Sequence, residues 1–108
     1  MTNESEYMKM LKAFQAEIKE KCNGKLRLRF VGLDGWDRPV FKDDSITNMF
    51  FGDVDHIFKP SDSKEKIFEY YRERRLNLDR ILTYFGKAFR CEAWGIPLTG
   101  IDVKIVED

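Results

Sequence analysis

A single histidine is the first candidate for catalysis in this chain of 108 residues. His56 lies close in sequence to Asp53 and Asp55, and a carboxylate can orient a histidine that acts as a general base. Nothing in the sequence marks a nucleophile that such a base would activate. We therefore expect His56 to belong to a connecting segment, and a carboxylate-oriented base stays open as the alternative.

The two cysteines offer a second kind of chemistry. Cys22 and Cys91 lie far apart and lack the paired ligand spacing of a zinc site. Cys91 precedes Glu92, but its neighbours alternate in a way that predicts an inward-facing, unreactive thiol. The N-terminus, MTNESEYMKM, has neither the basic nor the apolar region of a secretion signal, so we expect a cytoplasmic protein with reduced thiols. We expect no metal, no cofactor and no enzymatic activity.

Three arginines form the most basic cluster of the chain. Arg72, Arg74 and Arg75 fall towards the end of a predicted helix, where cations interact favourably with the helix dipole. Residues 61–90 carry eight basic and five acidic side chains, whereas residues 91–108 carry one basic and four acidic. We interpret these as solvated faces, and contact of the cluster with nucleic acid or an acidic protein as the alternative. The whole chain has 19 basic and 19 acidic residues, which argues against a general nucleic-acid coat.

A tryptophan and an arginine follow the turn signal Asp34-Gly35. Large aromatic side chains are mostly buried, so we expect the ring of Trp36 to cover one end of the core. The alternative is an anchor for a binding partner, because tryptophan is enriched at binding hot spots. In that case Trp36 and Arg38 belong to the contact surface.

Two amphipathic helices are predicted to hold these residues in place. The first runs from about Glu4 to Cys22, with Asn3 as its N-cap and Asn23-Gly24 as its stop. Its apolar residues recur at helical spacing. They are Tyr7, Leu11, Phe14 and Ile18. The second helix opens after Pro60, and its capping box pairs Asp62 with Glu65.

Alternating apolar and polar residues predict the strands. In Lys25–Val31 the arginines Arg27 and Arg29 share one face, which we expect to be the solvent side of a sheet; a phosphate grip is the alternative. Short strands follow at Val40-Phe41 and at residues 49–51. Residues 78–85 are compatible with strand or with a longer second helix, and we favour strand for residues 80–85 because they contain β-formers before Gly86.

Two further strands are predicted after Gly86, namely Ala88–Trp94 and Ile101–Val106. The expected order is therefore αβββαβββ in a single domain, residues 1–108. The fold class is α+β, with a mainly antiparallel sheet of five to six short strands covered by two helices. No apolar run approaches the roughly 18 residues that a membrane span requires.

Three motifs carry a resemblance to a known family. They are F-x-G-x-D-x-W-x-R-P-V-F-K at Phe30–Lys42, F-G-D-V-D-x-I-F at Phe51–Phe58, and Y-F-G-x-x-F-x-C-E-x-x-G at Tyr84–Gly95. In this order they resemble the large polyvalent-protein-associated domains of phages and conjugative elements. Where such domains carry Glu-Pro after the cysteine, this chain has Glu92-Ala93. The resemblance implies a mobile-element origin and an accessory role beside larger proteins, and it brings no catalytic residues with it.

We therefore expect a small, non-catalytic protein-interaction module of a mobile genetic element. Its partner would be a protein of the host or of the element. A phage-type inhibitor of a host defence nuclease is a more specific form of this hypothesis. Weak nucleic-acid binding through the arginine cluster is the remaining alternative, and it predicts binding that falls steeply with salt.

Overall fold

A computed structural model describes residues 6–46, 49–79, 81–85 and 94–107 of the chain. Its helices are α1 (Glu6–Lys21) and α2 (Lys64–Glu73). Its strands are β1 (Lys25–Leu33), β2 (Pro39–Lys42), β3 (Met49–Asp53), β4 (Ile81–Phe85), β5 (Trp94–Gly95) and β6 (Asp102–Val106). The predicted α+β class and the order αβββαβββ are confirmed, although β5 has only two residues.

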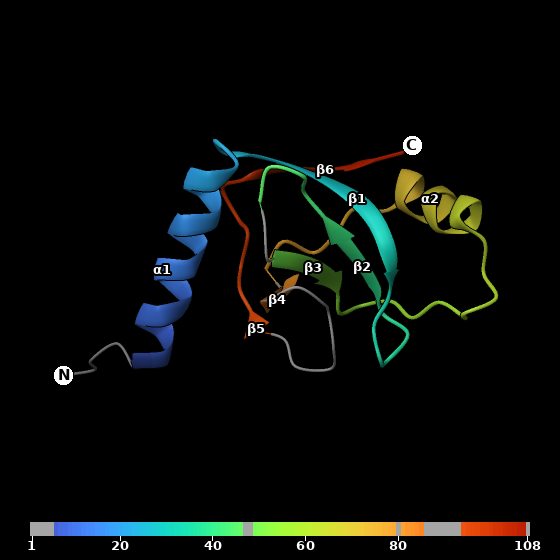
Figure 1. The fold of residues 1–108 in the computed structure, drawn as a ribbon, viewed down its shortest axis with the longest axis horizontal. Helices are drawn as coiled ribbons and strands as arrows, with labels where there is room; N and C mark the ends of the chain where they lie inside the picture. Colours follow the sequence, from blue (N-terminus) through green and yellow to red (C-terminus); the bar gives the residue numbers. More distant parts are fainter. Residues whose placement is uncertain (1–5, 47–48, 80, 86–93, 108) are drawn as a thin grey trace.

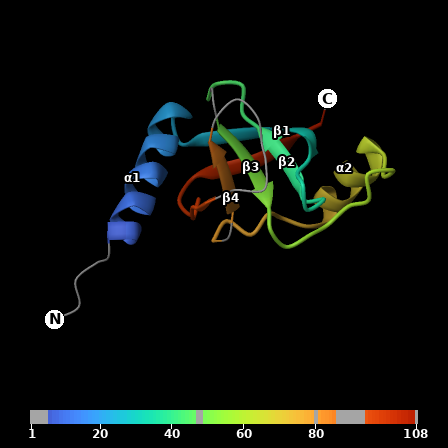
Figure 2. The same ribbon diagram turned by 60° about the horizontal axis from the view of Figure 1, so that its bottom comes forward.

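The strands form one mixed sheet in the order β5-β4-β3-β2-β1-β6. Neighbouring strands pair antiparallel, except that β6 runs parallel to β1. Helices α1 and α2 stand at opposite ends of the sheet, as both views show (Figures 1 and 2). The sheet is thus mainly antiparallel, as predicted, and the parallel pairing places the last strand at its edge.

Residues 81–85, which could have extended the second helix, form a strand. β4 pairs antiparallel with β3, with Thr83 opposite Phe51. Helix α2 ends at Glu73, because Arg74 already has an extended backbone with φ −129° and ψ 149°. Arg74 and Arg75 therefore lie beyond α2, and their predicted position in its last turns is wrong. Most of the predicted strand at residues 88–94 lies outside the described residues.

The predicted end of the first helix is confirmed. Asn23 and Gly24 have φ values of 55° and 75°, the left-handed conformation that ends many helices. The amide of Gly24 donates a hydrogen bond to the carbonyl of Lys19 at 2.9 Å. The predicted N-cap at Asn3 lies outside the described residues.

The prediction that Asp62 caps the N-terminus of the second helix is wrong. Ser63 is the N-cap of α2, and its hydroxyl accepts a hydrogen bond from the amide of Lys66 at 3.2 Å. Asp62 accepts instead from the amide of Lys59 at 2.8 Å and pairs with the Lys66 ammonium. Asp62 cannot cap the helix because its carboxylate closes the preceding turn.

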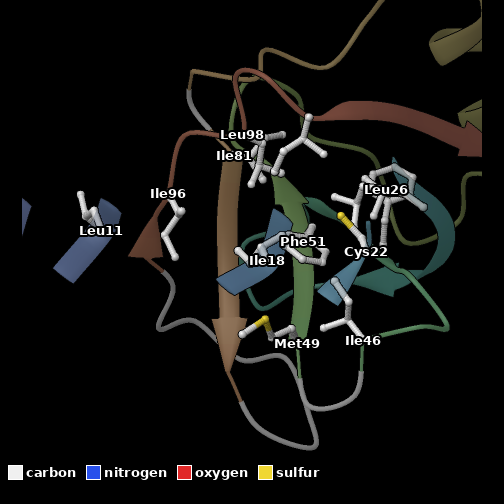
Figure 3. Close-up of a cluster of buried hydrophobic side chains, with 13 residues drawn as sticks. Leu11, Ile18, Cys22, Leu26, Ile46, Met49, Phe51, Ile81, Ile96 and Leu98 are labelled. Atoms are coloured by element: carbon white, nitrogen blue, oxygen red, sulfur yellow. The ribbon is translucent and has the colours of Figure 1, made fainter. Parts of the chain in front are cut away.

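One face of the sheet carries the main hydrophobic core, and both helices contribute to it. Leu11 and Ile18 of α1 belong to the core cluster, and Tyr71 of α2 packs against it. The ring of Tyr71 lies edge-on to Phe41 of β2, with centroids 5.5 Å apart. Figure 3 shows side chains from α1, the strands and the segment at residues 96–98 converging on this cluster. Leu11, Phe14 and Ile18 of the predicted apolar stripe therefore belong to the core, whereas Tyr7 is 50% exposed.

The opposite face carries a smaller cluster and several ion pairs. Val40, Phe50 and Tyr84 are buried together on this side. Arg27 pairs with Asp102 at 3.0 Å, and Arg29 pairs with Asp44 at 2.7 Å. These contacts show that the two arginines of β1 line a solvated face, as predicted.

Candidate functional site

The turn between β1 and β2 presents the most exposed aromatic ring among the large hydrophobic residues that the structure describes. Trp36 is 62% exposed, so the prediction that its ring covers the core is wrong. Asp34, two residues earlier, is buried in its place. The polar residue points inwards because the turn supplies hydrogen-bond donors for it, and the apolar ring is left outside.

The carboxylate of Asp34 organises this turn. One of its oxygens accepts hydrogen bonds from the backbone amides of Trp36 at 2.8 Å and Arg38 at 3.0 Å. The other oxygen accepts from the Arg38 guanidinium at 2.7 Å and from the Tyr84 hydroxyl. The amide of Asp34 also donates to the carbonyl of Arg38 at 3.0 Å. Trp36 is thus carried by a backbone that both oxygens of one buried carboxylate hold in place.

The charge of Asp34 is stabilised despite its burial. Burial alone would raise the pKa of Asp34, but the hydrogen bonds that its carboxylate accepts, led by that from Tyr84, outweigh burial and lower the pKa. Burial and the bond to Asp34 raise the pKa of the Tyr84 hydroxyl, so it remains a donor at neutral pH. The carboxylate therefore stays ionised and keeps its donors in place.

Tyr84 reaches the turn by crossing a glycine. Gly52 of β3 pairs with Val40 of β2 on one side and with Leu82 of β4 on the other. A Cβ atom built on Gly52 would lie 2.8 Å from the ring and the hydroxyl of Tyr84. Only glycine leaves room here for the ring to pass over β3 towards Asp34.

A second exposed apolar side chain lies on the segment next to the turn. The amide of Phe58 donates a hydrogen bond to the carbonyl of Asp37 at 3.0 Å, which ties residues 56–58 to the turn. Ile57 in this segment is 65% exposed. We refer to Trp36 and Ile57 together as the Trp36–Ile57 surface. Phe58 is buried and packs against Tyr70 and Tyr71 of α2.

His56 packs against aromatic rings. Its ring centroid lies 4.2 Å from that of Phe58 and 4.0 Å from that of Tyr70. The nearby carboxylate of Asp53 is buried and accepts hydrogen bonds from the Asp55 amide and the Tyr71 hydroxyl. Asp53, one of the two carboxylates considered as partners of His56, therefore takes part in holding α2 to β3.

The structure separates the five residues proposed from the sequence as a contact surface. Arg38 binds Asp34, and its side chain is 18% exposed, so it supports the turn that carries Trp36. Arg72 lies in α2 and pairs with both Glu107 and Glu65. Arg74 lies over the ring of Tyr70 at 4.7 Å. Arg75 is exposed just beyond the helix. The arginines of this cluster thus belong to α2 and its continuation, and Trp36 belongs to the β1–β2 turn.

Sequence reasoning placed Asp34 in the turn signal but did not predict its burial, and it missed Tyr84 and Ile57. The hydrogen bond from the Trp36 amide to Asp34 is the one that the turn signal predicts, because aspartate readily accepts bonds from amides two residues on. Tyr84 had no such signal, since its partner is 50 residues away. Ile57 lies in a connector whose exposure depends on how the chain folds back.

Comparisons of the chain with models of protein families, with curated proteins and with solved structures find no match. Among the described residues, no three histidine, cysteine or acidic side chains come together as a group that could hold a metal ion. Neither described helix has the length and apolar character needed to span a bilayer.

Proposed function

We propose that this protein is a small, non-catalytic protein-interaction module whose main contact is the Trp36–Ile57 surface. One observation carries the proposal: Trp36 is 62% exposed on a turn whose backbone amides donate hydrogen bonds to a buried carboxylate. A tryptophan ring brings a large apolar area to an interface. A backbone that is already ordered before binding loses less entropy on binding.

The two exposed side chains favour a protein partner. Trp36 and Ile57 are apolar, and the segments that carry them are joined by the bond between Phe58 and Asp37. Aromatic anchors surrounded by smaller contacts are typical of protein–protein hot spots. A partner with an apolar pocket for the indole ring fits this arrangement.

The setting of this interaction follows from the resemblance to phage and conjugative-element domains. In this setting the protein is an accessory factor of a mobile genetic element and acts on a protein of the element or of its host. Inhibition of a host defence nuclease is the more specific version. A plaque or interference assay with wild type and Trp36→Ala tests that version, which requires the wild type to weaken the defence and the variant to do so less.

Nucleic-acid binding has less support from the arginine cluster. Arg72 is bound by two carboxylates, and Arg74 is stacked on Tyr70. Phosphate contact would have to compete with these interactions. Binding to a labelled duplex and to a single strand at low salt would favour this alternative, with a steep decline as salt rises.

The decisive experiment is comparative affinity capture from cells of the source organism. Wild type, Trp36→Ala and Ile57→Ser are immobilised beside Tyr7→Ala, whose side chain is also exposed but lies on α1. We expect one or more proteins to be retained by wild type and by Tyr7→Ala, and to be lost with Trp36→Ala. Equal retention by Trp36→Ala, with its fold verified by circular dichroism, would contradict the proposal.

A further inference from the structure

A groove of about 530 Å³ separates α2 and the segment that follows it from β6. Phe68 and Tyr71 of α2, Leu76 beyond it, and Val103 and Ile105 of β6 give it an apolar lining. Val103 and Ile105 are only half-buried, although they face the core side of the sheet. The groove thus leaves apolar surface of the last strand accessible.

The groove lies along an edge of the sheet. Among the described residues, β6 is the last strand on this side, with β1 as its neighbour. The amide of Asp102 donates to the carbonyl of Gly24, so Asp102 directs its backbone groups towards β1. Successive residues of a strand direct these groups to opposite edges, so the amides and carbonyls of Val103 and Ile105 point outwards. Such an edge is a template for an added strand.

The charges around the groove indicate which kind of partner segment could pair with β6. The lining includes the cations Arg72, Arg74, Arg75 and Lys104 and the anions Asp102 and Glu107. Both anions are already neutralised within the fold, Asp102 by Arg27 and Glu107 by Arg72. Within the described part of the chain, neither Arg75 nor Lys104 has a carboxylate in ion-pair distance. The groove therefore offers positive charge that a partner's carboxylates would complement.

We infer that this groove binds an extended, acidic peptide segment of a partner protein, which adds to β6 as a seventh strand. Outward-facing groups of Val103 and Ile105 hydrogen-bond the peptide backbone. Alternate apolar side chains of the peptide enter the groove beside Val103 and Ile105. The acidic side chains between them lie on the opposite face, where Lys104 lies, and Arg75 adds positive charge along the groove. This is a second binding surface, and it does not depend on the Trp36–Ile57 surface.

The test uses a fluorescein-labelled peptide of alternating valine and glutamate, roughly eight residues long so that it spans the five residues of β6. Fluorescence polarisation measures its binding to the full chain. We expect binding that weakens with salt. The same peptide with lysine in place of glutamate should not bind. Absence of binding by the acidic peptide at about 1 mM, a concentration that detects very weak complexes, would overturn the inference.

Charge-reversal variants locate the peptide. Arg75→Glu and Lys104→Glu should each weaken binding by about tenfold or more, the effect of losing one charge-assisted contact. Lys64→Glu reverses a charge at the start of α2, away from the groove lining, and serves as the matched control. Trp36→Ala should bind the peptide as wild type does, which separates this result from the proposed function. Unchanged binding by both Arg75→Glu and Lys104→Glu would overturn the inference.

Hydrogen exchange distinguishes an added strand from a groove that merely takes side chains or small anions. In the protein alone, the amide of Lys104, which faces β1, should exchange slowly, and those of Val103 and Ile105 should exchange fast. Saturation with the acidic peptide should slow exchange at Val103 and Ile105. Binding without this added protection, or octanoate binding as tightly as the peptide, would show that no strand is added and would overturn the inference.

Discussion

Replacing Asp34 by asparagine tests whether one buried carboxylate holds the turn. The substitution keeps the shape of the side chain but turns one oxygen into an amide nitrogen, which donates instead of accepting. The backbone amides of Trp36 and Arg38 can still donate to the remaining oxygen. The Arg38 guanidinium then faces an NH₂ group, and the Tyr84 hydroxyl must reverse its role.

The expected loss of stability is about 3 kcal/mol, the lower end for removing one partner of a buried ion pair, because Arg38 retains some contact with water. Tyr84→Phe removes a single hydrogen bond from the same carboxylate and should cost about 1–2 kcal/mol. Asp44→Asn is the matched control, since Asp44 pairs with Arg29 at 2.7 Å but its side chain is 75% exposed. We expect the control to unfold at the same urea concentration as the wild type.

Urea unfolding followed by circular dichroism measures these differences. With an m-value of about 1.5 kcal/mol per M, a loss of 3 kcal/mol lowers the midpoint of Asp34→Asn by about 2 M. Midpoints that are equal for Asp34→Asn and Asp44→Asn would refute the reasoning. They would mean that the turn is held by its backbone conformation and not by the carboxylate.

The contribution of Asp34 to the free energy of unfolding has a defined pH dependence, which a comparison of Asp34→Asn with the wild type measures. The pKa of Asp34 is lowered in the folded protein from an ordinary value of 3.8. Its contribution to the free energy of unfolding is therefore fully present above about pH 4 and is lost as the pH falls through the folded pKa. Asp34→Asn should lose less stability than the wild type over this acid range. A parallel decline of the two proteins would show that other groups govern acid unfolding.

Three further substitutions, the first with Gly95→Ala as its control, test the packing around this turn and the sheet. Gly52→Ala places a methyl group 2.8 Å from Tyr84 and should cost about 1–3 kcal/mol by overpacking, whereas Gly95→Ala, with no described atom within 4 Å, should unfold at nearly the wild-type midpoint. Thr83→Val removes a buried hydroxyl that has no hydrogen-bond partner among the described residues, so it should be neutral or stabilise by up to about 1 kcal/mol in the same urea assay; a clear destabilisation would reveal a partner. Trp36→Ala should change the free energy of unfolding by less than about 0.5 kcal/mol, because the ring is 62% exposed and its backbone amide is retained; a loss above about 1.5 kcal/mol would show that the ring belongs to the core.

Local sequence patterns were sufficient to predict individual helices and strands of the chain. The apolar stripe of α1, the strict alternation in β1 and the stop at Asn23-Gly24 were all predictable. Each follows from the backbone period or from the conformational preferences of the residues concerned. The same reasoning assigned residues 81–85 to a strand and placed Arg27 and Arg29 on a solvated face.

Which turn residue faces inwards, and which groups lie at the sheet edges, became visible only in the folded chain. A turn signal predicts that the chain reverses, but the choice between burying Asp34 and burying Trp36 depended on Tyr84, 50 residues away. Likewise, the pairing of Arg72 with Glu107 spans 35 residues, and β6 could be placed beside β1 only after the whole chain had folded back. Periodicity tells which side chains share a face, whereas contacts between distant segments decide what that face meets.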